Sequence, residues 1–412
     1  GGVIMKAKNY NLNDTKLDDS KVFRDAVHNY IHVDQPVILD LINSKEMQRL
    51  RRIKQLGGTH LVYQSAEHSR FCHCLGVYFI VRKMIFNSEV GKYLSDYDKL
   101  TVMCAALLHD LGHGPFSHCF EGAFGLNHEE YTVKIINGNS EVNCILESFE
   151  KGFSKKVSSI IEKTHPNTIL IQMISSQLDA DRMDYLLRDS YFTGTTYGHF
   201  DLYRILRVMK VVDNKIVYKY SGVQAIENYI LARYHMYWQV YYHPTSRSYE
   251  QLLISIFRRM KDLYNEGYDF GDIRYLNPFL DGNVNEVDYV KLDESIVLYY
   301  FRLLSESNDK ILADLCDRFL NRKLFAYRDL NNEEEKIKII KEFAKSGIAV
   351  RYYVVSDDQS QIPYLYYDNN EVNAIEILVN HELKLLPEVS EIVGAITNSS
   401  KNKIDHKIFY PE

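Results

Sequence analysis

The chain has 412 residues, of which 46% are apolar and 25% charged, and its formal net charge is −6. This composition is typical of a folded globular protein and argues against a disordered chain. The acidic total excludes a global basic field for DNA or a membrane surface, and no apolar run reaches membrane-spanning length. The six cysteines lack the spacing of a disulfide framework, so we expect a reducing compartment, the cytoplasm.

The first elements are expected to be a hairpin and two helices. Residues 21–34 mix β-branched and polar side chains, which indicates a short hairpin or an extended segment. From Pro36 apolar residues recur every three or four positions, which predicts a helix that ends at Gly57. Extended backbone is expected at residues 61–63. A helix then carries the apolar residues of 71–81.

The middle of the chain predicts further helices. Residues 100–111 form a strongly apolar helical pattern that Gly112 stops, and Pro115 suits the first turn of the next helix. Asn127 is expected to cap another helix. Helical patterns continue over residues 169–190.

The second half mixes helices and strands. A β-like stretch at residues 215–220 precedes a long helix over 223–242, which Pro244 closes. Residues 348–355 and 362–367 indicate two strands separated by a polar turn. The expected class is therefore mainly α with a smaller C-terminal α+β region.

A cluster of candidate metal ligands is the strongest chemical signal. His109 and Asp110 end the apolar helix, although one His-Asp pair alone fits equally well a capping Asp beside a half-buried His. Imidazole and carboxylate together suit Mn, Fe, Co, Ni or Zn at a hydrolytic centre. His73 and Asp181 are candidates for two further ligands from other helices.

Three motifs carry a family resemblance: H-S-R-F-x-H-x-L-G-V from residue 68, H-D-L-G-H-G-P-F-S-H from residue 109, and D-A-D-R-M-D-Y-L-L-R-D from residue 179. They resemble the HD-domain deoxynucleoside triphosphate (dNTP) triphosphohydrolases, both the bacterial enzymes and the vertebrate enzyme with a sterile-alpha-motif domain. The likeness runs from about residue 21 to about residue 323, and it implies the helical HD-domain fold. The family's metal ligands match His73, His109, Asp110 and Asp181.

The resemblance also implies a domain division and a reaction. We expect an N-terminal segment over residues 1–50 with an activator site, an HD phosphohydrolase core over 51–275, and the α+β region over 276–412. Water would attack the α-phosphorus in line, and His118 would protonate the departing O5′, giving a deoxynucleoside and inorganic triphosphate. Magnesium would accompany the nucleotide phosphates.

Several residues match the family's catalytic and substrate groups. His118 and Glu121 share a helix face, so the carboxylate would support the charged imidazole, although the vertebrate relative has Asp in place of Glu121. His113 and His128 match histidines that line the phosphates. The expected substrate contacts are Gln55, Leu56, Arg70, Arg182, Tyr185, Asp189, Arg233, Tyr237 and Tyr241, with Tyr237 replacing a family His. The alternative for the helix that carries Tyr185 and Asp189 is a solvated amphipathic helix.

A basic patch from Gln48 to Lys54 is a candidate activator site, against the alternative of a solvated basic helix. By resemblance, a guanine nucleotide or dNTP would bind Lys21, Val22, Asn43, Gln48 and Arg51, with Arg322 and Lys323 from a neighbouring subunit. A second activator would lie near Arg24, Val62, Tyr63, Arg204 and His243. The implied assembly is a homotetramer. No membrane partner is expected, and nucleic acid is at most a secondary partner, at the basic patch.

Two rival functions remain open from sequence. One is another HD phosphohydrolase, such as a 5′-nucleotidase or a phosphodiesterase. The other is a nucleotide sensor without turnover.

Overall fold

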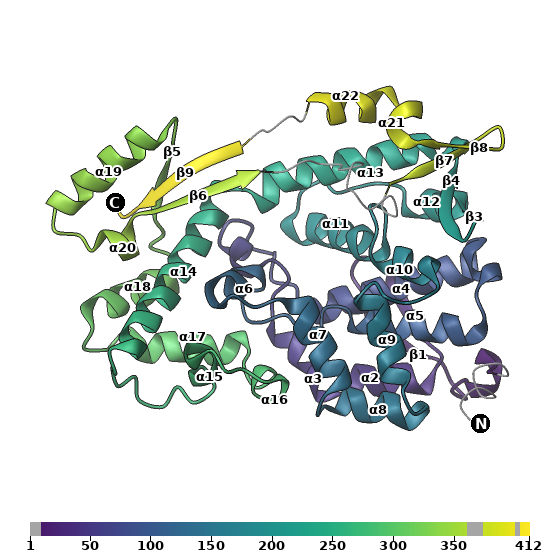
Figure 1. Cartoon of the computed structure of the whole chain (residues 1–412), viewed down its shortest axis with the longest axis horizontal. Helices are drawn as coiled ribbons and strands as arrows, with labels where there is room; N and C mark the ends of the chain where they lie inside the picture. The colour runs from purple at the N-terminus through teal and green to yellow at the C-terminus, as the bar shows by residue number, and fades with distance from the viewer. Residues whose placement is uncertain (1–9, 361–373, 400–403) are drawn as a thin grey trace.

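The structure is a computed structural model that describes residues 10–360, 374–399 and 404–412. Helices dominate it, and the C-terminal part of the chain contains strands as well as helices, as the sequence predicted (Figure 1). The first group of helices comprises α2 (Pro36–Asn43), α3 (Lys45–Arg49), α4 (Arg70–Asn87), α5 (Asp96–Leu108), α6 (His118–Phe124), α7 (His128–Asn137), α8 (Glu141–Phe149), α9 (Phe153–Ile161), α10 (Thr168–Ile174) and α11 (Ala180–Thr193). Short 3-10 turns accompany them: η1 (Leu12–Thr15), η2 (Leu50–Arg52), η3 (Gly57–Leu61) and η4 (Val90–Tyr93).

The second group of helices follows residue 200: α12 (Leu202–Val208), α13 (Val223–Met236), α14 (Pro244–Asn265), α15 (Asn277–Asp281), α16 (Glu286–Tyr289), α17 (Glu294–Leu304), α18 (Lys310–Leu320), α19 (Glu333–Lys345), α20 (Val350–Tyr353), α21 (Leu386–Val389) and α22 (Glu391–Ser399). A 3-10 turn, η5 (Tyr220–Gly222), precedes α13, and a π-helical turn, η6 (Tyr237–Tyr241), follows it. No described helix has the length and apolar character that crossing a membrane requires.

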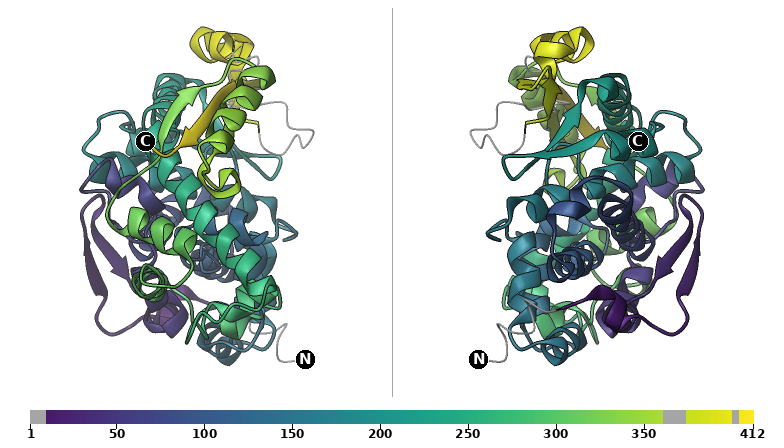
Figure 2. Two further views of the ribbon diagram at one scale, coloured as in Figure 1. Left: turned by 90° about the vertical axis from the view of Figure 1, so that its left-hand side faces the viewer. Right: turned by 90° about the vertical axis from the view of Figure 1, so that its right-hand side faces the viewer.

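The strands form three small sheets. β1 (Lys21–Asp25) and β2 (Asn29–Val33) make the predicted antiparallel hairpin, which stands at the outer edge of the helical body in Figure 2. A four-stranded sheet has the order β3-β4-β7-β8 and contains β3 (Met209–Val212), β4 (Lys215–Lys219), β7 (Glu376–Val379) and β8 (Glu382–Leu385). A three-stranded sheet has the order β5-β9-β6 and contains β5 (Ala326–Asp329), β9 (Ile404–Tyr410) and β6 (Val355–Ser360).

The core that positions the site is built around α4. Apolar residues cover almost the whole circumference of this helix, so it is buried on nearly all sides. It packs against α5 and α11. The N-terminal turns of α4 and α11 therefore meet the C-terminal end of α5 inside the protein.

Three predictions in the first half were wrong. The helix predicted from Pro36 to Gly57 is divided into α2, α3 and η2 and ends at Arg52, because Ser44 has an extended backbone and caps a new helix. The backbone at residues 61–63 is not extended, because the N–H groups of Val62 and Tyr63 both donate to the carbonyl of Thr59 and close a turn. Pro115 does not begin a helix, because the next two residues, Phe116 and Ser117, have φ values of +58° and +54°. α6 therefore begins only at His118.

The second half also differs from expectation. The helix predicted over residues 223–242 ends at Met236 and passes into η6, where the N–H of Tyr242 donates to the carbonyl of Tyr237 five residues earlier. Pro244 begins α14 instead of only ending its predecessor. The predicted strand 348–355 contains α20, and the polar residues expected in a turn belong to β6, which pairs with β9. The predicted strand 362–367 lies outside the described residues.

Candidate active site

Three helices bring His73, His109 and Asp181 to one point. Their donor atoms all lie within 4.8 Å of one another, and His73 Nε2 is 3.0 Å from an Asp181 oxygen. His109 donates from Nδ1 to the carbonyl of Ala106, so its Nε2 faces the group. That buried Nε2 has no hydrogen-bond partner among the described residues, so its lone pair is available to bind a cation. The donor set therefore fits a divalent transition metal.

Charge around His73 supports the same conclusion. Burial alone would lower the pKa of this imidazole, yet Asp181 and Asp184 raise it to about 10. The carboxylates thus favour positive charge at this point, either a proton or a cation. His73 Nδ1 donates to Asp184 at 2.8 Å, which leaves Nε2 to bind a metal.

Asp110 approaches both imidazoles from the side. One oxygen lies 3.4 Å from His109 Nε2, and the other lies 3.7 Å from His73 Nε2. Arg70 donates to the second oxygen. Although burial opposes it, His109 and Arg70 hold the pKa of Asp110 well below its usual value, so Asp110 is a carboxylate and is able to bind a metal. All four predicted ligands are therefore close together.

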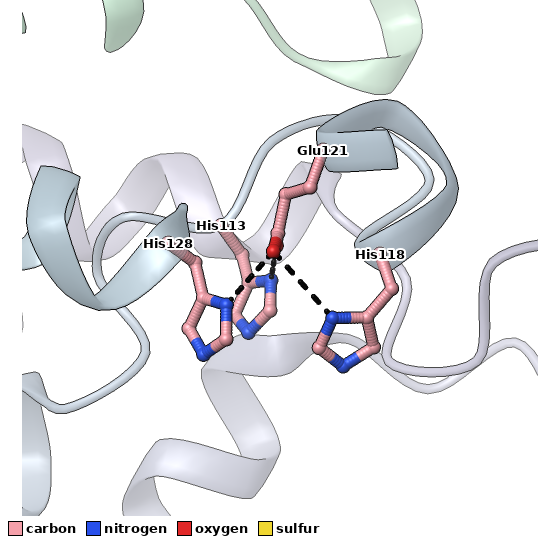
Figure 3. A group of neighbouring side chains, drawn as sticks. All are labelled: His113, His118, Glu121 and His128. Carbon is pink, nitrogen blue, oxygen red and sulfur yellow. Dashed lines mark hydrogen bonds and ion pairs between the residues drawn. The ribbon is translucent and has the colours of Figure 1, made fainter. Parts of the chain in front are cut away.

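A second cluster gathers three imidazoles around Glu121 (Figure 3). Its carboxylate oxygens lie 2.8 Å from His113, 2.9 Å from His128 and 3.6 Å from His118. Burial opposes ionisation, but the three nearby imidazoles hold the pKa of Glu121 well below its usual value, and His128 donates a hydrogen bond to it. One carboxylate thus orients three rings.

The three histidines differ in their chemistry. Burial and the nearby Arg70 lower the pKa of His113 to about 4, so this imidazole is neutral at pH 7. His128 stacks on it with ring centroids 3.9 Å apart. His118 is different, because its side chain is 73% exposed while Glu121 still supports it. Of the three, His118 is the ring best placed to pass a proton to a ligand.

Both clusters border one cavity of about 530 Å³, a volume typical of small-molecule sites. Among the predicted residues its lining includes Gln55, Leu56, Arg70, Asp110, His113, His118, His128, Asp181, Arg182, Tyr185, Asp189, Tyr237 and Tyr241. Cationic, aromatic and acidic side chains thus surround one space beside the metal ligands.

The family models divide the chain into two adjacent regions. The model of the HD domain matches residues 70–189, which contain both clusters. The model of the HD associated region matches residues 200–412, half of the chain. The chain belongs to the HD-domain family. The boundaries expected at residues 50 and 275 stay a prediction.

Relatives of this HD-domain protein extend over nearly its full length. An uncharacterized Bacillus subtilis protein is 49% identical to this chain, and the match covers 96% of this chain and 93% of that protein. A Dictyostelium discoideum protein named as a deoxynucleoside triphosphate triphosphohydrolase homolog is 30% identical, with 92% of this chain and 76% of that protein covered. The crystal structure of a Bacteroides thetaiotaomicron phosphohydrolase matches with a TM-score of 0.85 and 29% identity, over 96% of this chain and all of that one.

The HD-domain cavity has a second polar corner formed by Asp189 and three tyrosines. Tyr241 donates to Asp189 at 2.8 Å, and His68 lies 2.7 Å from the other carboxylate oxygen. The hydroxyls of Tyr185 and Tyr237 are 3.3 Å apart. The sequence predicted Asp189 and the tyrosines as site residues but not His68. The position of His68 at the start of the first motif could have indicated it.

All three predicted cationic contacts are engaged within the protein. Arg70 donates to Asp110 and Ser117 and still borders the cavity. Arg182 donates to Asp179 and to the carbonyl of Ser176, although it still borders the cavity. Arg233 is buried and donates to Gln177 at 2.8 Å, outside the cavity lining.

The HD-associated region adds cavity residues that the sequence analysis missed: Tyr242, Arg247, Tyr249, Glu250 and Gln359. Burial and the nearby Asp357 raise the pKa of Glu250 to about 7, against the effect of Arg247. Tyr242 directly follows η6, and the other four residues lie on α14 and β6; none of the five belongs to a recognisable motif.

The predicted activator residues fall into separate groups. Gln48 accepts from Arg51 at 2.8 Å and donates to the carbonyl of Ile42, beside Asn43. Elsewhere the ring of Tyr63 meets that of His243, next to Val62. Arg322, expected to act in a neighbouring subunit, donates to the carbonyl of Leu61 within this chain.

The remaining activator candidates have local contacts. Lys21 and Val22 are exposed on β1, and the guanidinium of Arg24 lies over the ring of Tyr30. Arg204 donates to the carbonyl of Ser221, and Lys323 pairs with Asp317.

Proposed function

We propose that this HD-domain protein hydrolyses dNTPs to deoxynucleosides and inorganic triphosphate. The observation that carries the proposal is the exposed imidazole of His118, which Glu121 supports in the same cavity as the metal ligands. The relative from Dictyostelium discoideum is named for this activity, which supports the choice of substrate.

Each part of the cavity has a task in this reaction. His73, His109, Asp110 and Asp181 would hold one divalent transition metal, which polarises phosphate oxygens and lowers the pKa of water. Arg70 donates to the phosphates, whose magnesium ion enters with the nucleotide. The neutral His113 and its stacked neighbour His128 line the triphosphate.

Proton transfer falls to His118. As water attacks the α-phosphorus in line and the bond from phosphorus to O5′ breaks, the imidazolium of His118 gives a proton to O5′. Glu121 stabilises the charged ring before this transfer. The deoxyribose lies at the corner of Tyr185, Asp189 and Tyr241, with Gln55 and Leu56 against the 3′ side. Close packing there disfavours a ribose 2′-hydroxyl.

Product analysis tests the reaction. Incubation of dGTP with the manganese-loaded protein should release deoxyguanosine and triphosphate, separated by ion-exchange chromatography. A double variant, His109→Ala with Asp110→Ala, serves as the control and should show no turnover. Release of monophosphate and pyrophosphate would contradict the proposal, and release of phosphate from nucleoside monophosphates would favour a 5′-nucleotidase.

We also propose that a guanine nucleotide or dNTP activates a cytoplasmic homotetramer of this chain. The exposed guanidinium of Arg51, held by Gln48 beside Asn43, supports the first activator site together with Lys21 and Val22 on the hairpin. Arg322 and Lys323 of an adjoining subunit would complete it. Val62, Tyr63 and His243, with Arg24 and Arg204, would serve a second activator.

The activator proposal has its own test. Hydrolysis of pure dATP should rise severalfold on addition of GTP or dGTP, and light scattering should show a tetramer. Arg51→Ala should remove the stimulation while the unstimulated rate persists. Equal rates with and without every guanine nucleotide would refute it.

A further inference from the structure

The turn of the β1–β2 hairpin reaches into the protein core. Residues on its strands such as Lys21, Val22 and Tyr30 are exposed, yet Asp25 and His28 at the turn are buried. Asp25 accepts the N–H groups of Val27 and His28 at 2.9 and 2.8 Å, which fixes the turn. Burying a charged and a polar side chain at a hairpin tip costs free energy unless both are paired.

Both residues are paired with the far side of the metal site. His28 Nε2 lies 2.6 Å from Asp184, and Asp25 accepts two hydrogen bonds from Arg188 at 2.9 and 3.2 Å. Arg188 also donates twice to Asp184, at 2.9 and 3.0 Å. The ring of His28 stacks on Phe79 of α4, with centroids 4.5 Å apart.

Asp184 is thereby held on every side. It accepts from His73 Nδ1, and it is completely buried. The backbone of α4 approaches it at Gly76, where a Cβ atom would lie 1.9 Å from a carboxylate oxygen of Asp184 and 2.5 Å from Arg188. The carboxylate has no free direction in which to turn.

We propose that His28 and Asp25 are positioning residues for the metal site. They hold Asp184, which orients His73 so that Nε2 points at His109 and Asp181. The hairpin turn then helps to set the metal affinity, although His28 precedes His73 by 45 residues. This inference rests on the metal site of the proposed function and is independent of the substrate.

Metal affinity of the full-length protein, without nucleotide, tests the proposal. Cobalt binding is measured by competition with a chromophoric chelator, and the visible spectrum reports the ligand geometry. His28→Ala should weaken cobalt binding about tenfold, the lower end of the range for groups that support metal ligands. His28→Gln keeps an N–H donor and should recover part of the affinity. His32→Gln, on the exposed face of the same hairpin, should bind as the wild type does.

A second variant guards against misfolding. Asp25→Asn keeps the size of the side chain and weakens only its hold on Arg188, so it should bind cobalt more weakly than the wild type while its metal-free melting temperature stays within a few degrees. Unchanged affinity and spectrum in folded His28→Ala or Asp25→Asn would overturn the proposal and leave the network a structural clamp. Failure of the wild type to bind cobalt at all would instead contradict the metal site itself.

Discussion

At the scale of single residues, the site depends on carboxylates that each serve several partners. Glu121 meets three imidazoles, and Asp184 meets His28, His73 and Arg188. A carboxylate offers about four lone-pair directions, so one side chain is able to fix several rings in a small volume. Removal of any such carboxylate disturbs more than one functional group.

The role of His118 gives the first prediction. His118→Gln should lower kcat by about 10² to 10⁴-fold with little change in KM, because the ring transfers a proton without carrying most of the substrate affinity. Steady-state kinetics with dGTP measures both constants. His235→Gln, an exposed histidine of α13 outside the cavity lining, is the matched control and should leave kcat unaltered. A rise in KM alone would assign His118 to binding.

Glu294 gives a prediction about pH. Its carboxylate accepts the backbone N–H groups of Lys54 and Phe116 at 2.9 and 3.1 Å, and burial raises its pKa to about 7. In the unfolded chain a glutamate titrates near about 4.3. Between these values the folded protein keeps a proton that the unfolded chain has lost, so this group's contribution to stability declines as pH rises to 7, by roughly 4 kcal/mol in total.

Urea unfolding at pH 5 and pH 8 measures this effect. Glu294→Gln cannot titrate, so its stability relative to the wild type should improve by roughly 3 kcal/mol from the lower to the higher pH. A constant difference between the two proteins would show that Glu294 keeps an ordinary pKa.

At the scale of elements, the close approach of α4 to α11 depends on Gly76, which has no side chain. Gly76→Ala would place a Cβ atom against Asp184, and we expect a loss of about 1–3 kcal/mol in the free energy of unfolding together with weaker metal binding. Gly122→Ala in α6 is the control, since no atom lies within 4 Å of its added Cβ, and it should stabilise the protein by about 0.5–1 kcal/mol. Denaturant titration compares the two, and equal effects would contradict the close packing.

At the scale of the whole molecule, residues of the HD-associated region and of the HD domain line the same cavity. Arg247 of α14 donates to Asp357 on β6 and Asp405 on β9, at 2.8 and 2.5 Å. These contacts fasten the β5-β9-β6 sheet beside the cavity wall that contains Glu250 and Gln359. The C-terminal sheet is thus tied to the substrate space.

Replacement of this arginine should be costly. Arg247→Leu leaves Asp357 without its cation and Asp405 with Lys407 alone, and we expect a loss of about 3 kcal/mol in the free energy of unfolding. Arg274→Leu breaks an exposed pair with Asp272 and should change stability by less than about 1 kcal/mol. Similar losses in both variants, measured by urea titration, would show that the sheet is not anchored by Arg247.

The sequence predicted the parts of the molecule that local motifs encode. The helical class, the hairpin and the convergence of His73, His109, Asp110 and Asp181 follow from short segments with strong patterns. Long-range contacts were not predictable in this way. His28 contacts Asp184, which is 156 positions away, and Glu294 contacts Lys54, which is 240 positions away. No rule of residue spacing predicts such contacts.

The errors in the predicted elements have a related cause. Residues 61–63 have side chains that favour a strand, but the backbone closes a turn on Thr59. The π-helical turn after Met236 is set by the hydrogen bond from the N–H of Tyr242 to the carbonyl of Tyr237, which no apolar pattern predicts. Propensity is a weak guide where tertiary contacts decide the backbone.

Ser117 adopts φ +54° and ψ −126°, a region of the Ramachandran map that glycine occupies with ease and serine does not. Its hydroxyl accepts a hydrogen bond from Arg70 and donates one to the carbonyl of Lys54. A glycine at this position would relax the peptide and would lose both bonds. The serine therefore keeps backbone strain of about 1–3 kcal/mol in exchange for two hydrogen bonds of similar total worth, and these bonds tie the loop before α6 to Arg70 and to the backbone of Lys54.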